Sequence, residues 1–169
     1  MVVAKGGGAS LEAIERVYRR DGTRFLHVAT AIVGDVELAA DAVQDGFANA
    51  VRHRASFRGD GALEAWLWRT VVHAARKESG RASRRPVAVG ADVAVESNGG
   101  GNSGETIRAV VAFLPERQRH ALFLRYYADL DYAAIAAALD MSIGTVGSTL
   151  AAAHAALRPL IEETTREHS

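Results

Sequence analysis

Residues 131–150 read DYAAIAAALDMSIGTVGSTL, and this stretch decides the fold of the C-terminal part of the chain. Its larger apolar residues recur at the spacing of two short helices that share a core, namely Ile135, Leu139, Val146 and Leu150. Asp140 falls between them, where a tight turn needs a left-handed backbone that Asp tolerates better than most residues. The pattern predicts a helix-turn-helix, whose second helix enters the DNA major groove. A plain helical hairpin in an Ala-rich bundle is the alternative interpretation.

Helical patterns continue on both sides of this unit. Upstream, a helix over residues 106–114 is followed by Pro115 at the start of a helix that runs to residue 127. Downstream, Ser142 caps a last helix that runs to about residue 161, and Pro159 bends its end. The C-terminal part is therefore helical throughout.

The first half of the chain shows helical periodicity over residues 10–33, 36–54 and 62–82, with Ser10 and Asp35 as N-caps of the first two segments. Residues 86–104 are rich in Gly, Ser and Asn and lack a helical period, which predicts a flexible linker. We therefore predict an all-α fold of two small helical domains. Its parts are a disordered tail over 1–9, an N-terminal domain over 10–85, the linker over 86–104 and a helix-turn-helix domain over 105–165.

The composition excludes several classes of site. The chain has no cysteine, so disulfides, thiolate zinc sites and cysteine nucleophiles are excluded. Its six histidines are scattered, and none stands at metal-ligand spacing. We therefore expect no metal, no cofactor, no small-molecule substrate and no enzymatic activity. The N-terminus does not resemble a signal peptide, and no apolar run approaches the roughly 18 residues of a membrane span. We expect a cytoplasmic protein without direct membrane insertion.

The net charge of zero hides an uneven distribution along the chain. Residues 68–85 carry six Lys and Arg against one Glu, a local excess of plus five. Residues 105–169 carry six basic and eight acidic residues, a local charge of minus two. The first block favours contact with phosphates, whereas the C-terminal part as a whole does not attract them.

Both halves of the chain resemble conserved regions of the extracytoplasmic-function sigma factors of bacterial RNA polymerase. The marks of the fourth conserved region are Leu114-Pro115, Arg117-Gln118-Arg119, Leu124-Arg125, Tyr132-Ala133, Ile135-Ala136, Leu139 and Gly144-Thr145-Val146. The marks of the second are Gly34-Asp35, Asp41, Val43-Gln44-Asp45, Phe47, Phe57-Arg58-Gly59 and Trp66-Leu67-Trp68-Arg69. Two motifs in this order and at this separation are more specific than either alone.

The resemblance implies a polymerase-binding helix. In the family, the helix with the residues that correspond to Asp41, Gln44, Asp45 and Phe47 docks on a coiled coil of the largest polymerase subunit. The three polar residues lie off the apolar stripe of their helix and are expected to face a partner. Phe47 lies on the stripe, which favours a place in the core.

The resemblance also implies contacts with the minus-ten promoter element. The loop that contains Phe57, Arg58 and Gly59 corresponds to the family's specificity loop, which holds a base flipped out of the duplex. The helix after it is expected to follow the non-template strand through Arg69, His73, Arg76, Lys77 and Arg81. Trp68 lies off the apolar stripe and is the expected stacking residue, whereas Trp66 is expected in the core.

The recognition helix departs from the family, because the usual Lys and Arg after Gly-Thr-Val are absent and residues 142–157 carry no charge except on His154 when it is protonated. Each lost phosphate contact makes the slope of log binding constant against log salt concentration shallower by roughly 0.9. Residues that remain for the minus-thirty-five element are Arg117, Arg119, Arg125, Ser142, Thr145, Ser148 and Thr149. We expect weak binding of this element by the domain alone.

Three functions follow from these patterns. A working sigma factor would bind core RNA polymerase and promoter DNA, and would be held by an anti-sigma protein, as is common in the family. A sigma-like adaptor or competitor would bind polymerase yet read the minus-thirty-five element poorly. A helix-turn-helix repressor unrelated to sigma factors would leave the N-terminal half unexplained.

Overall fold

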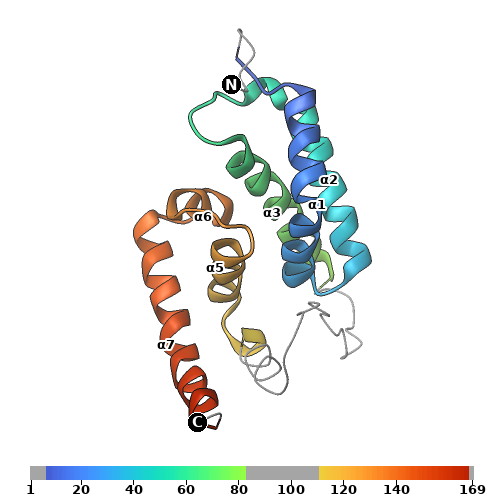
Figure 1. Cartoon of the computed structure of the whole chain (residues 1–169). Helices are drawn as coiled ribbons and strands as arrows, with labels where there is room; N and C mark the ends of the chain where they lie inside the picture. Colours follow the sequence, from blue (N-terminus) through green and yellow to red (C-terminus); the bar gives the residue numbers. More distant parts are fainter. Residues whose placement is uncertain (1–6, 83–110, 168–169) are drawn as a thin grey trace.

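The computed structural model describes residues 7–82 and 111–167, and every regular element in these ranges is helical (Figure 1). The expected linker over 86–104 and most of the expected tail lie outside the described residues. Ala9, which the prediction placed in the disordered tail, is buried, and its N–H donates to the carbonyl of Arg54 at 2.9 Å. Ordered structure thus begins before the Ser10 cap.

The first three helices form an N-terminal bundle, and local signals set their ends. Helix α1 spans Leu11–Val33, and the Ser10 hydroxyl accepts from the N–H of Ala13 at 3.2 Å. It ends at Gly34, whose φ of 84° is left-handed, the conformation that glycine adopts at little cost. Helix α2 spans Val36–Arg52 and is capped by Asp35, which accepts from Leu38 N–H at 2.9 Å.

Helix α3, Leu63–Ala82, packs against both α1 and α2 and follows the short helix η1, Arg54–Ser56. The α2 and α3 backbones approach closely at Gly46, where an added Cβ would lie 2.7 Å from Val71 Cα. Only glycine fits at this crossing. The buried core of the bundle is apolar and partly aromatic, with Phe25 at its centre, fully buried.

A polar cluster ties α1 to the start of α3. Arg20 donates to the largely buried carboxylate of Asp21 at 2.7 and 3.0 Å and to Glu64 at 3.1 Å. The hydrogen bond to Asp21, followed by that to Glu64, raises the pKa of Arg20 above its ordinary value. The guanidinium is therefore a fixed charge at this junction.

The C-terminal part contains helices α5, Glu116–Tyr126, α6, Tyr132–Leu139, and α7, Ile143–Glu167. Asp131 caps α6 by accepting from Ala134 N–H at 2.8 Å, and Ser142 accepts from Thr145 N–H at 3.1 Å. Asp140 lies in the turn with φ 54° and ψ 48°, the predicted left-handed conformation. The predicted helix-turn-helix and the all-α fold class are confirmed.

The two halves of the chain lie against each other. Helix α6 packs on α3, and α5 contacts α1 more narrowly, while α7 extends away from the N-terminal bundle (Figure 1). Helix α7 continues past Pro159 to Glu167 instead of ending near residue 161. Among the described residues no single helix is long and apolar enough to cross a membrane, although the bent pair α6 and α7 passes by length and composition.

Candidate nucleic-acid interface

The exposed face of α2 presents three polar side chains. Asp41, Gln44 and Asp45 are all exposed and lie about two to three turns from the Asp35 cap. Phe47 is buried, with its ring packed edge-on against Tyr18 at 5.0 Å and Phe25 at 4.9 Å. Its place on the apolar stripe predicts this burial, so the polar trio alone is available to a partner.

A groove of about 510 Å³ runs between α2, η1 and α3; we name it the α2–α3 groove. Its polar and aromatic lining comes from Asp45, Asn49, Arg52, His53, Trp66, Arg69, His73 and Lys77. Three permanent cations against one acid attract an anionic chain, and an aromatic ring beside them offers a stacking surface. The groove therefore has the chemistry of a single-stranded nucleic acid site.

The two tryptophans of α3 exchange the roles that their spacing predicts. Trp68 is 2% exposed and stacks on Phe25, so the expectation that it stacks on an unpaired base is wrong. Trp66 is only partly buried, lines the α2–α3 groove and lies 5.5 Å from the Phe57 ring. The reason is that α3 packs on α1 as well as α2, which widens its buried stripe to include Trp68.

The loop before α3 contains one buried residue followed by exposed ones. Phe57 is 7% exposed, so its ring anchors the loop to the core and is not free to face a base, contrary to its predicted role in DNA contact. Arg58 is exposed, and Gly59 has φ 77°, a conformation that strains other residues. Arg58 and the Gly59 backbone are the parts of the predicted set that the loop presents to solvent.

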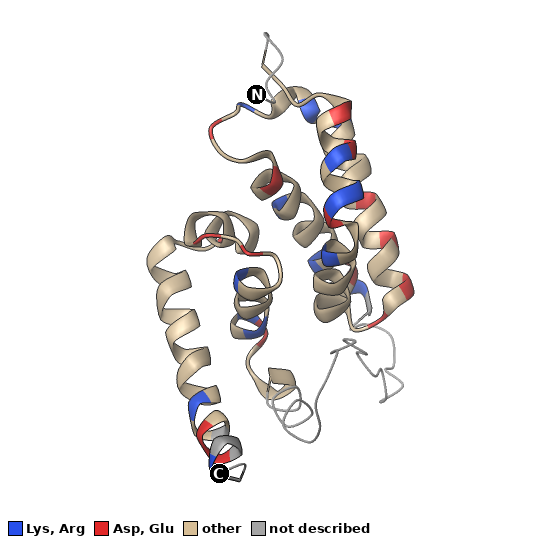
Figure 2. Cartoon of the chain, viewed as in Figure 1, with Lys and Arg blue, Asp and Glu red and all other residues tan. Residues whose placement is uncertain are grey.

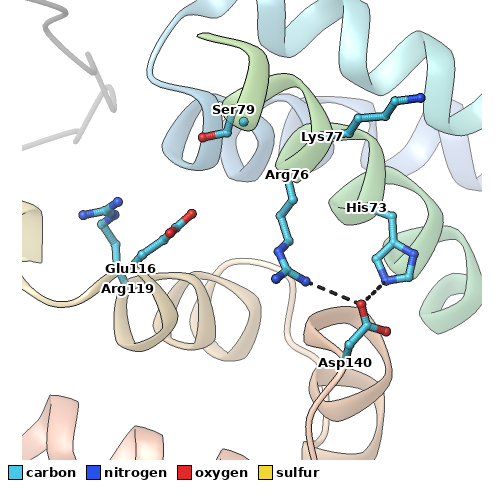
Figure 3. A pocket seen from close by; sticks show the side chains of 8 residues that line it. His73, Arg76, Lys77, Ser79, Glu116, Arg119 and Asp140 are labelled. Carbon is cyan, nitrogen blue, oxygen red and sulfur yellow. Dashed lines mark ion pairs between the residues drawn. The ribbon is translucent and has the colours of Figure 1, made fainter. Parts of the chain in front are cut away.

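The basic residues of α3 separate into two groups. Arg69, Lys77 and Arg81 are exposed, although Arg81 lies 3.8 Å from Glu78. His73 and Arg76 instead face Asp140 of the helix-turn-helix, with Nε2 of His73 at 3.2 Å and Nη1 of Arg76 at 3.6 Å from its Oδ2 (Figure 3). The His73 contact lacks the geometry of a hydrogen bond.

The recognition helix presents hydroxyls and small side chains. Figure 2 shows no charged residue on α7 until its C-terminal turns. Ser142, Thr145 and Ser148 are exposed, with a hydroxyl contact of 2.8 Å between the first two and a bond of 3.1 Å from Ser148 to the Thr145 carbonyl. Thr149 is half-buried. This face is able to exchange hydrogen bonds with DNA but adds no charge attraction.

The predicted basic residues of α5 differ in whether their guanidinium groups make hydrogen bonds within the fold. Arg117 is exposed. Arg119 donates to the carbonyls of Ala112 and Leu114 at 3.3 and 3.4 Å, and Arg125 donates to the carbonyl of Leu130 at 3.1 Å. Both guanidinium groups thus support the local fold in addition to any contact with phosphate.

Sequence reasoning missed two features of these surfaces. Asn49, Arg52 and His53 face the α2–α3 groove from the end of α2, and only their helical spacing hints at a shared face. His120 on α5 is 2% exposed, and burial lowers its pKa to about 4, against the opposing effect of Glu116. No pattern in the sequence distinguishes this histidine from the others.

Comparison with known proteins places these surfaces in context. Residues 17–85 match the family Sigma-70 region 2, and residues 105–157 match Sigma-70, region 4. The chain is 32% identical to the ECF RNA polymerase sigma-E factor of Escherichia coli K12 over 88% of this chain and 94% of the relative. It is 29% identical to the RNA polymerase sigma-H factor of Pseudomonas aeruginosa over 90% of this chain and 95% of the relative.

Two solved structures share the fold. The sigma factor RpoE from Bartonella quintana, in complex with the anti-sigma factor NepR, aligns with a TM-score of 0.71 at 20% identity, over 90% of this chain and 98% of that chain. CnrH in complex with the cytosolic domain of CnrY aligns with a TM-score of 0.67 at 20% identity, over 91% of this chain and 90% of that chain. Both likenesses extend over the two halves together.

Proposed function

Because this chain belongs to the ECF class of the sigma-70 family, we propose that it binds bacterial core RNA polymerase and directs it to promoters, where it opens the DNA. The observation that carries the proposal is the placement of a cationic, aromatic groove directly beside an exposed polar helix face. One surface is suited to protein and the other to DNA, on adjacent helices of a single bundle. Catalysis belongs to the polymerase, and the chain acts in the cytoplasm, where that enzyme works.

The polymerase contact is assigned to Asp41, Gln44 and Asp45. All three are exposed on α2, and the two carboxylates project from a helix whose core face is fully used. Their charge suits a basic surface on a coiled coil.

The minus-ten element is assigned to the loop and the α2–α3 groove. Arg58 and the Gly59 backbone line the loop, while Trp66 and Arg69 face the groove. An unpaired base gains stacking on an indole, and its phosphates gain the nearby cations. The groove therefore favours the melted strand over the intact duplex.

The minus-thirty-five element is assigned to Ser142, Thr145 and Ser148 at the start of α7, with Arg117 as a backbone contact. Hydroxyls read bases or phosphates without the counterion release that Lys and Arg provide. This domain therefore sets the position of the protein on the promoter more than it adds to the affinity for DNA.

An anti-sigma protein is a further expected partner. One structural relative is bound to the anti-sigma factor NepR, and the other to the cytosolic domain of CnrY. A protein of this kind would silence the chain by covering the surfaces assigned above.

A pull-down of core RNA polymerase tests the first step. The double charge reversal Asp41→Arg with Asp45→Arg should abolish retention of polymerase. The matched control is Glu162→Arg with Glu163→Arg, which makes the same charge change at exposed positions of α7 and should retain binding. Equal retention of polymerase by all three proteins would refute the assignment to α2.

The uncharged recognition helix favours a second function, that of an adaptor or competitor which holds polymerase without reading the minus-thirty-five element. In that case the chain would compete with other sigma factors for core polymerase and would yield no transcript. Transcription by the reconstituted holoenzyme from a genomic promoter library separates the two functions. A sequence-specific footprint over a minus-thirty-five element would exclude the adaptor.

A further inference from the structure

The end of α2 carries a histidine whose tautomer is set by the backbone. The ring of His53 lines the α2–α3 groove, and its Nδ1 atom lies 3.0 Å from the carbonyl oxygen of Asn49. A carbonyl oxygen only accepts hydrogen bonds, so Nδ1 carries the hydrogen and donates it. In the neutral ring, Nε2 is then an acceptor on the side of the imidazole that points away from this carbonyl. His53 therefore offers the groove a hydrogen-bond acceptor.

A second acceptor lies beside this one. Ser56 also lines the α2–α3 groove, and its hydroxyl donates to the carbonyl oxygen of His53 at 2.7 Å. The single hydroxyl hydrogen is used in this bond, so the Oγ atom has only lone pairs left for a ligand. Both polar side chains at this end of the groove thus give their hydrogens to backbone carbonyls. What they present to the groove is a pair of acceptors.

The rest of the groove orients a base toward these acceptors. Trp66 lies in the first turn of α3, and its indole is 5.5 Å from the ring of Phe57, four residues after His53. Arg69 lines the groove one turn farther along α3. A nucleotide with its phosphate at Arg69 and its base stacked on Trp66 points the edge of that base toward the end of α2. The exocyclic group of the base is far from the sugar, so it meets the two acceptors.

We propose that the end of the α2–α3 groove selects an unpaired adenine or cytosine over guanine or thymine, through His53 and Ser56. The amino group of adenine or cytosine has two hydrogens, one for each acceptor. Guanine and thymine carry a carbonyl oxygen in that place, which has no hydrogen and would face the lone pairs of Nε2 and Oγ. The inference rests on the proposed function, since it takes the groove as the site of the melted strand, and it adds which bases this site reads.

Deaminated bases provide matched ligands, because deamination replaces the amino group by a carbonyl oxygen and leaves the size of the ring unchanged. Hypoxanthine is the deaminated form of adenine, and uracil is that of cytosine. Each of the four bases is placed in a short single strand between abasic nucleotides, so that only one base is able to stack on Trp66. Tryptophan fluorescence of the full-length chain reports binding at about pH 8, where imidazole is neutral. The adenine and cytosine strands should bind about 5- to 10-fold more tightly than their deaminated partners.

His53→Lys tests the residue itself. An ammonium group offers only donors, so this variant should reverse the preference and bind the hypoxanthine and uracil strands more tightly. Val36→Lys is the matched control, since it adds a positive charge at an exposed position of α2 outside the groove and should keep the wild-type preference. Ser56→Ala removes one acceptor and should lower the preference to about 2- to 3-fold. A purely structural role of His53 at the end of α2 predicts no reversal.

Transcription by the wild-type holoenzyme from a promoter library keeps the two levels apart, because it tests the proposed function without reference to the base preference. If the holoenzyme initiates but the full-length chain binds both members of each pair equally, or binds no strand, the base selection is overturned and the proposed function remains. If the holoenzyme does not initiate and no strand binds, the proposed function fails and the base selection fails with it. The same preference in His53→Lys as in Val36→Lys would overturn the assignment to His53.

Discussion

The indole of Trp68 stacks on the ring of Phe25, with the ring centroids 3.9 Å apart and 23° between the planes. Both rings are almost fully buried, and they join α1 to α3 in the centre of the N-terminal bundle. Trp66, two residues earlier, keeps part of its surface in the α2–α3 groove. Under the proposed function, Trp68 therefore serves stability and Trp66 serves DNA contact.

The first prediction separates these two roles. Trp68→Ala should lower the free energy of unfolding by about 3–5 kcal/mol, because it removes a large buried ring. Trp66→Ala should cost less stability and should reduce promoter opening, because it removes the stacking surface of the groove. Urea unfolding measures the first effect, and permanganate reactivity of the melted promoter strand measures the second. Trp66→Phe is the control that restores stacking, and a melting defect specific to Trp68→Phe would contradict the division.

The second prediction concerns the helix crossing at Gly46. Gly46→Ala should destabilise the chain by about 1–3 kcal/mol, because the added Cβ would lie 2.7 Å from Val71 Cα in a close-packed contact. Gly22→Ala is the matched control, since Gly22 also lies inside a helix but an added Cβ would have no atom within 4 Å beyond the nearby backbone of its own helix. That change should stabilise the chain by about 0.5–1 kcal/mol through helix propensity. Equal effects of the two substitutions on chemical unfolding would show that the crossing is loosely packed.

The third prediction is that the free energy of unfolding falls at acid pH because of His120. Its folded pKa of about 4 lies below the ordinary 6.5, so the unfolded chain takes up the proton first as the pH falls. Its contribution is fully present above pH 6.5 and is lost toward pH 4, with a slope of about 1.4 kcal/mol per pH unit and a total of about 3 kcal/mol.

Unfolding curves across this pH range check the effect. His120→Leu should flatten the dependence, whereas His27→Leu, a half-buried histidine on α1, should leave it unchanged. A slope that persists in His120→Leu would assign the fall at acid pH to other groups.

The fourth prediction restores charge to the recognition helix. Thr149→Arg with Ala152→Arg should tighten binding of a minus-thirty-five duplex. The slope of log binding constant against log salt concentration should steepen by up to roughly 0.9 per added phosphate contact. Ala152 is exposed and Thr149 half-buried, so the helix accommodates both side chains. Leu11→Arg, at an exposed position of α1, controls for added charge alone. An unchanged salt slope in the double variant would mean that α7 does not enter the major groove.

Local signals in the sequence predicted most of the fold. The caps Ser10, Asp35 and Asp131 and the left-handed turn at Asp140 act within a few residues, so they are readable from spacing alone. The apolar period likewise located the helices of both halves.

Contacts between distant elements were not predictable. The burial of Trp68 depends on the ring of Phe25 in another helix, and the spacing within α3 holds no information about that neighbour. The contact of His73 with Asp140 joins two domains, and neither residue has a local pattern that indicates a partner. The exposure of Phe57 was overestimated for the same reason, since its ring packs next to Trp66 only in the folded bundle.

The close approach of Gly46 to Val71 has a mechanical consequence. Gly46 packs directly against the backbone and side chain of Val71, so the close-packed crossing leaves little room for α2 to tilt against α3. Under the proposed function, α2 binds the polymerase and α3 binds the promoter strand. The two helices then move as one rigid body, so the polymerase sets the position of the melted strand without a hinge between the enzyme and the DNA.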